Sequence, residues 1–287
     1  MSELLSGFLD GANYVLFLML VTLGLAVIFG LMKVINMAHG EFVMLGAYSL
    51  LVANQSGLSP WLGLLLAPLV VGLVGLLVEE LLIRRVYSRL LDTILATWGL
   101  SILLKQAVIL GFGPGSHSVV KPLDFNLRLL GVDYPVYRLF IMVAAIAIIA
   151  ATFWFFFRTR MGLSARSVIA NRDMAACLGI NTRRLDRVTF SLGAALAGFA
   201  GALMAPIVSI DPYMGLGFLV PSFLSILVGG LGSIAAAMAG VGLIGGAEVF
   251  FKFNVSSVWA EIIVLGMAVV LIRLFPTGIL SRGGRKA

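Results

Sequence analysis

Long apolar runs constrain the fold of this chain more than any other feature of its sequence. The first run, Tyr14–Met32, contains no charged residue, and a helix needs about 20 apolar residues to cross the hydrocarbon core of a membrane. Eight further runs follow it, at Glu41–Ala53, Trp61–Val78, Leu91–Gly111, Val136–Phe157, Val188–Ile210, Gly217–Val228, Ile234–Phe250 and Val258–Phe275. The pattern predicts an all-α fold, a polytopic transmembrane helix bundle of about eight or nine membrane segments.

Two of these runs, Glu41–Ala53 and Gly217–Val228, are shorter than a membrane-spanning helix. Irregular backbone at membrane depth is tolerated only where it is buried in protein or lines a cavity, and transporters use broken helices in this way. We therefore expect a broken or re-entrant element within a single transmembrane domain, residues 1–287.

The composition supports a membrane protein and argues against several kinds of site. Hydrophobic residues make up 61% of the chain and charged residues 11%, whereas a soluble domain is about half apolar and a quarter charged. The single cysteine, Cys177, excludes a disulfide framework, and two histidines, His39 and His117, leave little for a metal cluster. We expect no metal site in this chain.

Basic residues predict how the bundle is oriented. The formal charge of +7 is gathered in clusters, at Arg84–Arg89, in the loop 158–187 and in the tail after Arg282. Because cytoplasmic loops retain Lys and Arg, this clustering indicates membrane orientation and not nucleic-acid binding. The N-terminal segment Met1–Asp10 has no basic residue, so the first run is not a cleaved signal peptide. We expect a multi-pass membrane protein, with the N-terminus outside and the loop 158–187 and the C-terminus in the cytoplasm.

The loop 158–187 contains seven basic and two acidic residues and a short helix candidate, Asn171–Leu178. Asn171 can cap this helix, Asp173 lies in its first turn, and Gly179 follows where a helix would end. Three apolar residues are spaced to share one face of it, namely Met174, Ala175 and Leu178. Such a face suits docking in the groove of another protein, and a solvated basic loop is an equally good interpretation of the spacing alone.

Three blocks of sequence resemble permeases of the branched-chain amino acid and urea group of bacterial ABC importers. They read VINMAHGEFVMLGAY, MGLSARSVIANRDMAACLGINTRRLDRVTFSLGAALAGFAGAL and FPTGILSRGGR, in the order that the family keeps. The resemblance implies that the short helix docks in a cleft of a cytoplasmic ATPase. It assigns to this coupling Asn171, Arg172, Asp173, Met174, Ala175, Leu178 and Gly179.

The resemblance also implies the partners of the chain. They are ABC ATPase subunits, a second homologous permease in a homodimer or heterodimer, an extracytoplasmic solute-binding protein and the lipid bilayer. The chain has no G-x-x-x-x-G-K-[ST] phosphate loop. ATP and Mg²⁺ are therefore expected on the partner ATPase subunits, and this chain is expected to bind no cofactor and to be no enzyme.

The segment KVINMAHGE places Asn36, His39, Gly40 and Glu41 between two apolar runs. In a cytoplasmic turn these polar residues would simply be solvated. At membrane depth they would have to line a cavity, with Gly40 at a helix break. The resemblance favours the second interpretation, so we expect this segment in the solute path.

The run Leu91–Gly111 contains further polar residues. Thr97 and Ser101 share a helix face and Trp98 follows Thr97, so a polar solute could meet hydroxyls and an aromatic wall. Hydroxyls that bond carbonyls of their own helix are the alternative. Neither the partner of Lys105 nor a role for Glu248 follows from the sequence.

Small residues recur every four positions at Gly193, Ala197 and Gly201. They predict a smooth strip where another helix backbone approaches closely.

Three classes of function compete. A secondary transporter would need several intramembrane carboxylates, and an intramembrane enzyme could use only His39 with Glu41 for acid–base chemistry. An importer permease explains the basic loop and the missing phosphate loop together. Within that family the stretches LDTILATWGLSILLKQ and NRDMAACLGI favour urea as the solute, with branched-chain amino acids or short amides as alternatives.

Overall fold

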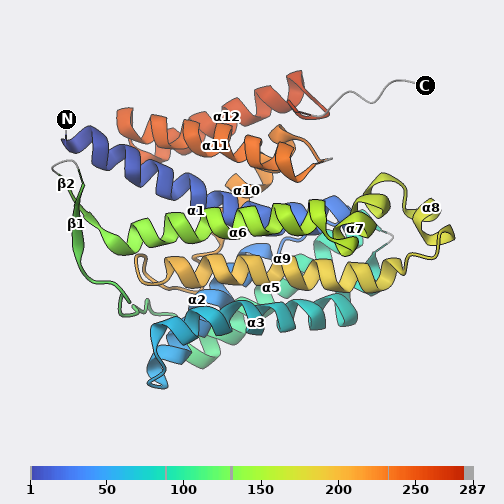
Figure 1. Ribbon diagram of the computed structural model, residues 1–287, viewed down its shortest axis with the longest axis horizontal. Coiled ribbons are helices and arrows are strands. Elements are labelled where there is room, and N and C mark those ends of the chain that lie inside the picture. The colour runs from blue at the N-terminus through green and yellow to red at the C-terminus, as the bar shows by residue number, and fades with distance from the viewer. Residues whose placement is uncertain (1, 88, 130–131, 232, 281–287) are drawn as a thin grey trace.

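The computed structural model describes residues 2–87, 89–129, 132–231 and 233–280, which form an elongated bundle of helices (Figure 1). The first half contains α1 (Ser2–Met32), α2 (His39–Gln55), α3 (Pro60–Val78), the π-helix η1 (Glu79–Ile83), α4 (Arg84–Val86) and α5 (Leu90–Phe112). The second half contains α6 (Val136–Arg158), α7 (Arg160–Ala170), α8 (Arg172–Cys177), α9 (Thr182–Met204), α10 (Leu216–Gly229), α11 (Ile234–Asn254) and α12 (Ser257–Leu274).

A short antiparallel hairpin joins the two halves. Its strands are β1 (Asn126–Leu129) and β2 (Val132–Pro135), and Asn126 pairs with Pro135. The hairpin lies at the end of the bundle where α1 begins (Figure 1). Its position is fixed by Tyr134, whose hydroxyl donates to Asp10 Oδ1 over 2.9 Å.

Within the described residues, seven helices are long and apolar enough to cross a membrane. The two predicted short runs correspond to α2, with 17 residues, and α10, with 14. The prediction of a polytopic bundle with a broken element is therefore confirmed, but the bounds of two helices differ from the predicted runs. Helix α1 begins at Ser2 and not at Tyr14. The helix expected over Val188–Ile210 is α9, which begins at Thr182 and ends at Met204. The first turns of α9 carry arginines that pair with acidic residues of η1. These turns are therefore helical although their sequence is not apolar.

Helix α9 lies at the centre of the bundle and packs against α1, α2 and α3. A Cβ on Gly193 would lie 2.6 Å from the carbonyl oxygen of Gly24 in α1, and one on Gly201 would lie 1.8 Å from that of Val43 in α2. Ala197, between them, is fully buried. The strip of small residues is thus a packing surface, as predicted, on which helices are in backbone contact.

The two short helices begin inside the bundle and meet there. A Cβ on Gly40 would lie 2.6 Å from the carbonyl oxygen of Gly215, and one on Gly215 would lie 2.1 Å from that of Gly40. Midway along α1, Val21 O lies 3.0 Å from His39 Nε2, and the ring of Phe17 lies 4.7 Å from that of Phe218. The N-termini of α2 and α10 therefore face each other at the middle depth of the bundle.

The two ends of the bundle differ in charge. Helices α7 and α8 and the start of α9 protrude at one end, which we call the basic end (Figure 1). The last turn of α1 and the end of α10 lie close to α7 there, since Phe29, Ile169 and Gly230 line one small cavity. After α12, Ile279 N donates to Val228 O at the end of α10 over 2.9 Å. Residue 2 and residue 280 thus lie at opposite ends, which agrees with an odd number of crossings.

Replacement of Gly46 should test whether backbone contact with α9 holds α2 in place. A Cβ at this position would lie 1.9 Å from Gly198 O, so we expect Gly46→Ala to cost about 1–3 kcal/mol or more by overpacking. Gly99→Ala in α5 is the control, because a Cβ there meets nothing within 4 Å. Thermal unfolding in detergent measures both. Equal melting temperatures for the two variants would contradict this account of the packing.

Candidate functional site

One face of α5 forms a polar seam that points into the bundle. Thr93, Thr97, Ser101 and Lys105 follow one another at four-residue intervals, so they lie in line along the helix. The three hydroxyl residues are each at most 2% exposed, and the Lys105 side chain is 15% exposed. The seam faces the segment 33–38 and the first turn of α2, because Thr97 contacts Met37 and Ser101 contacts Glu41.

Thr97 supports the irregular backbone that leads into α2. Its Oγ1 accepts a hydrogen bond from Met37 N over 3.1 Å and lies 2.9 Å from Thr93 O and 3.4 Å from Ile35 O. Asn36 contributes from within the segment, since its Oδ1 accepts from Ala38 N over 3.0 Å. Backbone without helical partners is costly in a membrane, so these side chains stabilise the break between α1 and α2. The Thr97 hydroxyl is therefore fully engaged by the protein.

Glu41 lies beside this break and forms a buried cluster with Ser101 and Lys105. The Ser101 hydroxyl donates to Glu41 Oε1 over 2.5 Å, and Lys105 Nζ lies 3.5 Å from the same oxygen. Glu41 is fully buried, and its Oε2 has no hydrogen-bond partner among the described residues. The structure thus supplies the partner of Lys105 that the sequence left open. It also leaves one carboxylate oxygen available at the centre of the bundle.

An apolar cavity of about 340 Å³ begins one helical turn beyond this cluster, toward the end opposite the basic end, and is not lined by Glu41, Ser101 or Lys105 themselves. Leu45 is one turn beyond Glu41 on α2, and Val108 is one turn beyond Lys105 on α5. The other lining residues from these helices and α3 include Tyr48, Val52, Leu66, Val70 and Phe112. The Tyr48 hydroxyl is buried without a partner in the described part of the chain. The cavity is therefore apolar along its walls, and its lining on α2 and α5 begins one turn from Glu41 and Lys105.

Two residues predicted for the solute path do not lie on the polar seam. His39 is fully buried against α1, where its Nε2 lies 3.0 Å from Val21 O, and Trp98 is 56% exposed on the outer face of α5. Successive helical residues point about 100° apart, so Trp98 cannot share the Thr97 face. For the same reason His39 and Glu41 lie on opposite sides of α2, which excludes them as an acid–base pair. Gly40 lies at the contact with Gly215.

The predicted docking helix is present as α8, although the loop 158–187 around it is largely helical. Asn171 Oδ1 accepts from Met174 N over 2.9 Å, and Gly179 has φ of +84°, so the predicted cap and stop are confirmed. Met174 and Leu178 are 59% and 75% exposed. Ala175 is only 2% exposed, on the side of α8 that packs toward α7 and α9. The prediction that Ala175 shares the outward face is wrong.

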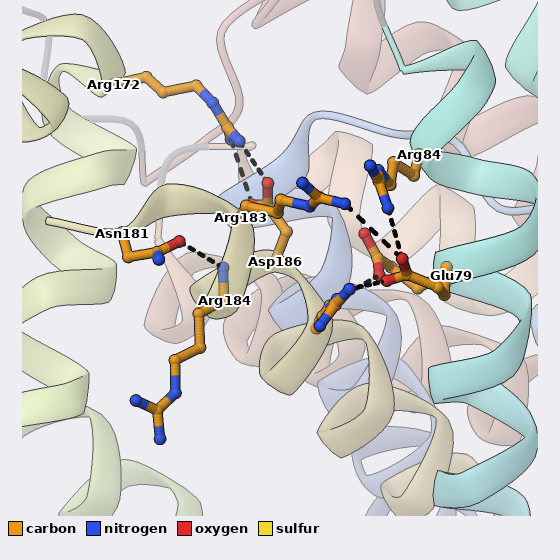
Figure 2. A network of polar contacts seen from close by, with 9 residues as sticks. Glu79, Arg84, Arg172, Asn181, Arg183, Arg184 and Asp186 are labelled. Carbon is orange, nitrogen blue, oxygen red and sulfur yellow. Dashed lines mark hydrogen bonds and ion pairs between the residues drawn. The ribbon is translucent and has the colours of Figure 1, made fainter.

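An arginine and carboxylate network connects α8 and α9 with η1 (Figure 2). Arg172, which follows Asn171 at the start of α8, donates to Asp186 Oδ1 over 3.2 Å and to the Tyr87 hydroxyl over 2.5 Å. Burial raises the pKa of Tyr87 to about 12, so this hydroxyl stays protonated. The neighbouring residue Asp173 lies in the first turn of α8.

The second part of the network centres on η1. Arg187 pairs with both Glu79 and Glu80, and Arg84 also pairs with Glu80. Arg183 reaches Glu80 over 3.7 Å. The contacts between η1 and α9 were missed in the sequence because about 100 residues separate the partners. Together these ion pairs link α8 to the start of α9, and the start of α9 to η1 at the C-terminal end of α3.

Glu248 is engaged at the opposite end of the bundle. The Tyr14 hydroxyl donates to its Oε1 over 2.8 Å, and Lys252 Nζ lies 2.6 Å from the same oxygen. A cavity of about 390 Å³ between α10 and α12 is lined by Glu248 and Glu261. In the described ranges no group of three or more His, Cys, Asp or Glu side chains could hold a metal ion.

Comparison with known proteins gives a consistent result. A family model described as "Branched-chain amino acid transport system / permease component" matches residues 7–272. The chain is 29% identical to the high-affinity branched-chain amino acid transport system permease protein LivH of Salmonella typhimurium, over 98% of this chain and 96% of the relative. It is also 29% identical to BraD of Pseudomonas aeruginosa, over the same shares. The permease protein LivM of Salmonella typhimurium is 29% identical over 96% of this chain and 70% of the relative. No solved structure matches the chain significantly.

Thr97→Val should test whether Thr97 supports the break before α2. The variant leaves Met37 N–H buried without its acceptor, and we expect a loss of about 1–3 kcal/mol of stability. Thr97→Ser keeps the hydroxyl and should stay closer to the wild type. Thermal unfolding in detergent measures the difference, and a valine variant as stable as the serine variant would count against the supporting role.

Proposed function

The chain belongs to the permease-component family of branched-chain amino acid transport systems, and on that premise we propose that it is a membrane subunit of an ATP-driven importer of branched-chain amino acids. The extent of the family match carries the proposal, since residues 7–272 take in nearly the whole helix bundle. Its relatives are membrane permeases and not enzymes. The task of this chain is therefore to move a solute, with no chemical step on its own residues.

Branched-chain amino acids are preferred over urea as the solute. The preference for urea drawn from the sequence finds no support in the relatives, whose names specify branched-chain amino acids. Part of that preference lay in the stretch around Thr97 and Trp98. Thr97 is engaged with backbone and Trp98 lies on the outer surface. The apolar cavity next to Glu41 suits an aliphatic solute better than a small polar one.

The proposed assembly follows from the missing phosphate loop and the exposed docking helix. Two ATPase subunits would bind at the basic end, and a second, homologous permease would complete the membrane unit. A second permease is supported by the similarity of this chain to two differently named permease proteins, LivH and LivM. An extracytoplasmic binding protein would deliver the solute at the other end. The positive-inside rule then places the basic end in the cytoplasm and the N-terminus outside, in an inner membrane.

A secondary transporter explains less of the molecule. It would not explain why Met174 and Leu178 are exposed on α8, or why an arginine network holds α8 in position. An ATPase docking site accounts for both. We therefore assign the outward face of α8 to the ATPase.

The solute can be identified with the reconstituted importer. The chain should be co-expressed and purified with ATPase, second permease and binding-protein subunits of this importer family from the same organism, and ATP hydrolysis measured in proteoliposomes. Leucine, isoleucine and valine should each stimulate hydrolysis severalfold, while urea and a short amide leave the basal rate unchanged. Stimulation by urea alone would overturn the substrate assignment, and the complex without its solute-loaded binding protein is the baseline.

Substitution of the outward face of α8 should test the docking. Met174→Asp with Leu178→Asp introduces two carboxylates where an apolar contact is proposed, and we expect at least a tenfold loss of ATPase association, because apolar anchors in an interface contribute about 2 kcal/mol or more. Met174→Leu with Leu178→Met keeps both side chains apolar and is the control. Pull-down from membranes measures association and requires that this end face the cytoplasm. Normal association of the aspartate variant would refute the assignment.

A further inference from the structure

We propose that Glu41 and Lys105 bind the charged groups of a zwitterionic amino acid, whose aliphatic side chain occupies the adjoining cavity. This inference rests on the proposed function and adds the chemistry of recognition. The solute ammonium would donate to Glu41, and the solute carboxylate would pair with Lys105. A neutral solute such as urea could use neither charge in this way.

The geometry of the pair leaves hydrogen-bonding capacity for a ligand. Lys105 Nζ and Glu41 Oε1 are 3.5 Å apart, longer than the usual 2.7–2.9 Å of a charge-assisted hydrogen bond. Glu41 Oε2 is buried and receives no hydrogen bond in the described part of the chain. A buried carboxylate with an unused oxygen is unfavourable unless further donors reach it. An ammonium group supplies such donors, and the accompanying carboxylate replaces Glu41 as the partner of Lys105.

The polar neighbours of the pair support the same orientation. Ser101 donates to Glu41 Oε1 over 2.5 Å and so fixes the carboxylate on α2. Glu41 also lies in the first turn of α2, where the helix dipole favours a negative charge. Along the cavity wall, the buried Tyr48 hydroxyl has no partner among the described residues. It is a second donor for a solute carboxylate held at Lys105.

The cavity gives the site its preference for aliphatic side chains. Its walls on α2, α3 and α5 are formed chiefly by Leu45, Val52, Leu66, Val70 and Val108. Its volume of about 340 Å³ exceeds that of a small polar solute and suits a branched hydrocarbon group. Since the two charges lie one helical turn from the start of this apolar space, the arrangement matches an amino acid with its charged groups at one end and its hydrocarbon at the other.

The position of the site fits import. The cavity extends along α2 away from the basic end, on the side where the solute would enter. Glu41 follows Gly40, which is in backbone contact with Gly215 at the junction of the two short helices. A solute bound at Glu41 would therefore stand directly before the contact between α2 and α10, which must open for the solute to pass.

The alternative is that the pair only fastens α5 to α2. The two explanations differ for the exchanged variant, Glu41→Lys with Lys105→Glu. Exchange preserves a salt bridge between the helices, so a fastening role predicts normal transport. Recognition predicts slow uptake of L-leucine, because exchanging the two charges while the side chain stays in the cavity moves the Cα hydrogen to the opposite side, an arrangement that fits the D-enantiomer.

The test is leucine uptake by the complete importer in proteoliposomes, with assembly of the complex and thermal stability as controls. We expect the exchanged variant to assemble and to take up leucine at least tenfold more slowly than the wild type. Uptake at the wild-type rate would overturn the recognition role while leaving the proposed function intact. A wild-type importer that carried urea and no amino acid would overturn both.

A second measurement avoids any change at the pair. In a Cys177→Ser background, a cysteine at Ser49 lines the cavity, and its labelling by a small impermeant maleimide should be slowed at least fivefold by leucine. Isoamylamine, which lacks the carboxylate, and isocaproate, which lacks the ammonium group, should protect far less at equal concentration. Equal protection by all three compounds, or none by leucine, would contradict a zwitterion site even if the exchanged variant did not fold.

Discussion

Backbone contact along α9 is the interaction on which the rest of the structure depends. Helices in a membrane gain little from burial of apolar surface against one another, so their association relies on close packing. Gly193 and Gly201 bring α9 into contact with α1 and α2, and Gly75 of α3 adds a third approach at Ala194. With α1 and α2 held to the same central helix, the segment between them stays inside the bundle and is not extruded to the surface. The break at residues 33–38, and with it the position of Glu41, follows from this packing.

Helix α5 joins the two functional regions of the molecule. Tyr87, just before α5, contacts Arg172 at the start of the docking helix, while Thr97 and Lys105 along α5 reach the break and Glu41. Cavities border α5 on the sides facing α2 and α3, and only 17% of the residues in its apolar 18-residue stretch are buried in the protein. A loosely packed helix with contacts at both places can shift without disturbing the α9 core. It is the element through which movement of α8 would reach the polar seam.

The sequence predicts those features that depend on local chemistry. Run lengths predict the long helices and the two short ones, four-residue spacing predicts the strip on α9, and Asn171 and Gly179 predict the limits of α8. Features that depend on distant partners were missed. Arg183 and Arg187 extend α9 because they meet Glu79 and Glu80, and Lys105 meets Glu41 only once α2 folds back. The rotation of about 100° between successive helical residues likewise places His39 and Glu41 on different sides of α2, and Trp98 and Thr97 on different sides of α5, although each pair is close in the chain.

The π-helical turn η1 has a mechanical consequence. A π-helix closes its hydrogen bonds one residue further along the chain than an α-helix, so a change from π to α at Glu79–Ile83 would shift the register of all that follows. One residue of register corresponds to about 100° of rotation about the helix axis. Because Arg84 and Arg187 bind the carboxylates of this turn, a partner that drew those arginines away would release it. The ion pairs of Arg84 and Arg187 thus hold the end of α3 in a register that differs by one residue from that of a continuous α-helix.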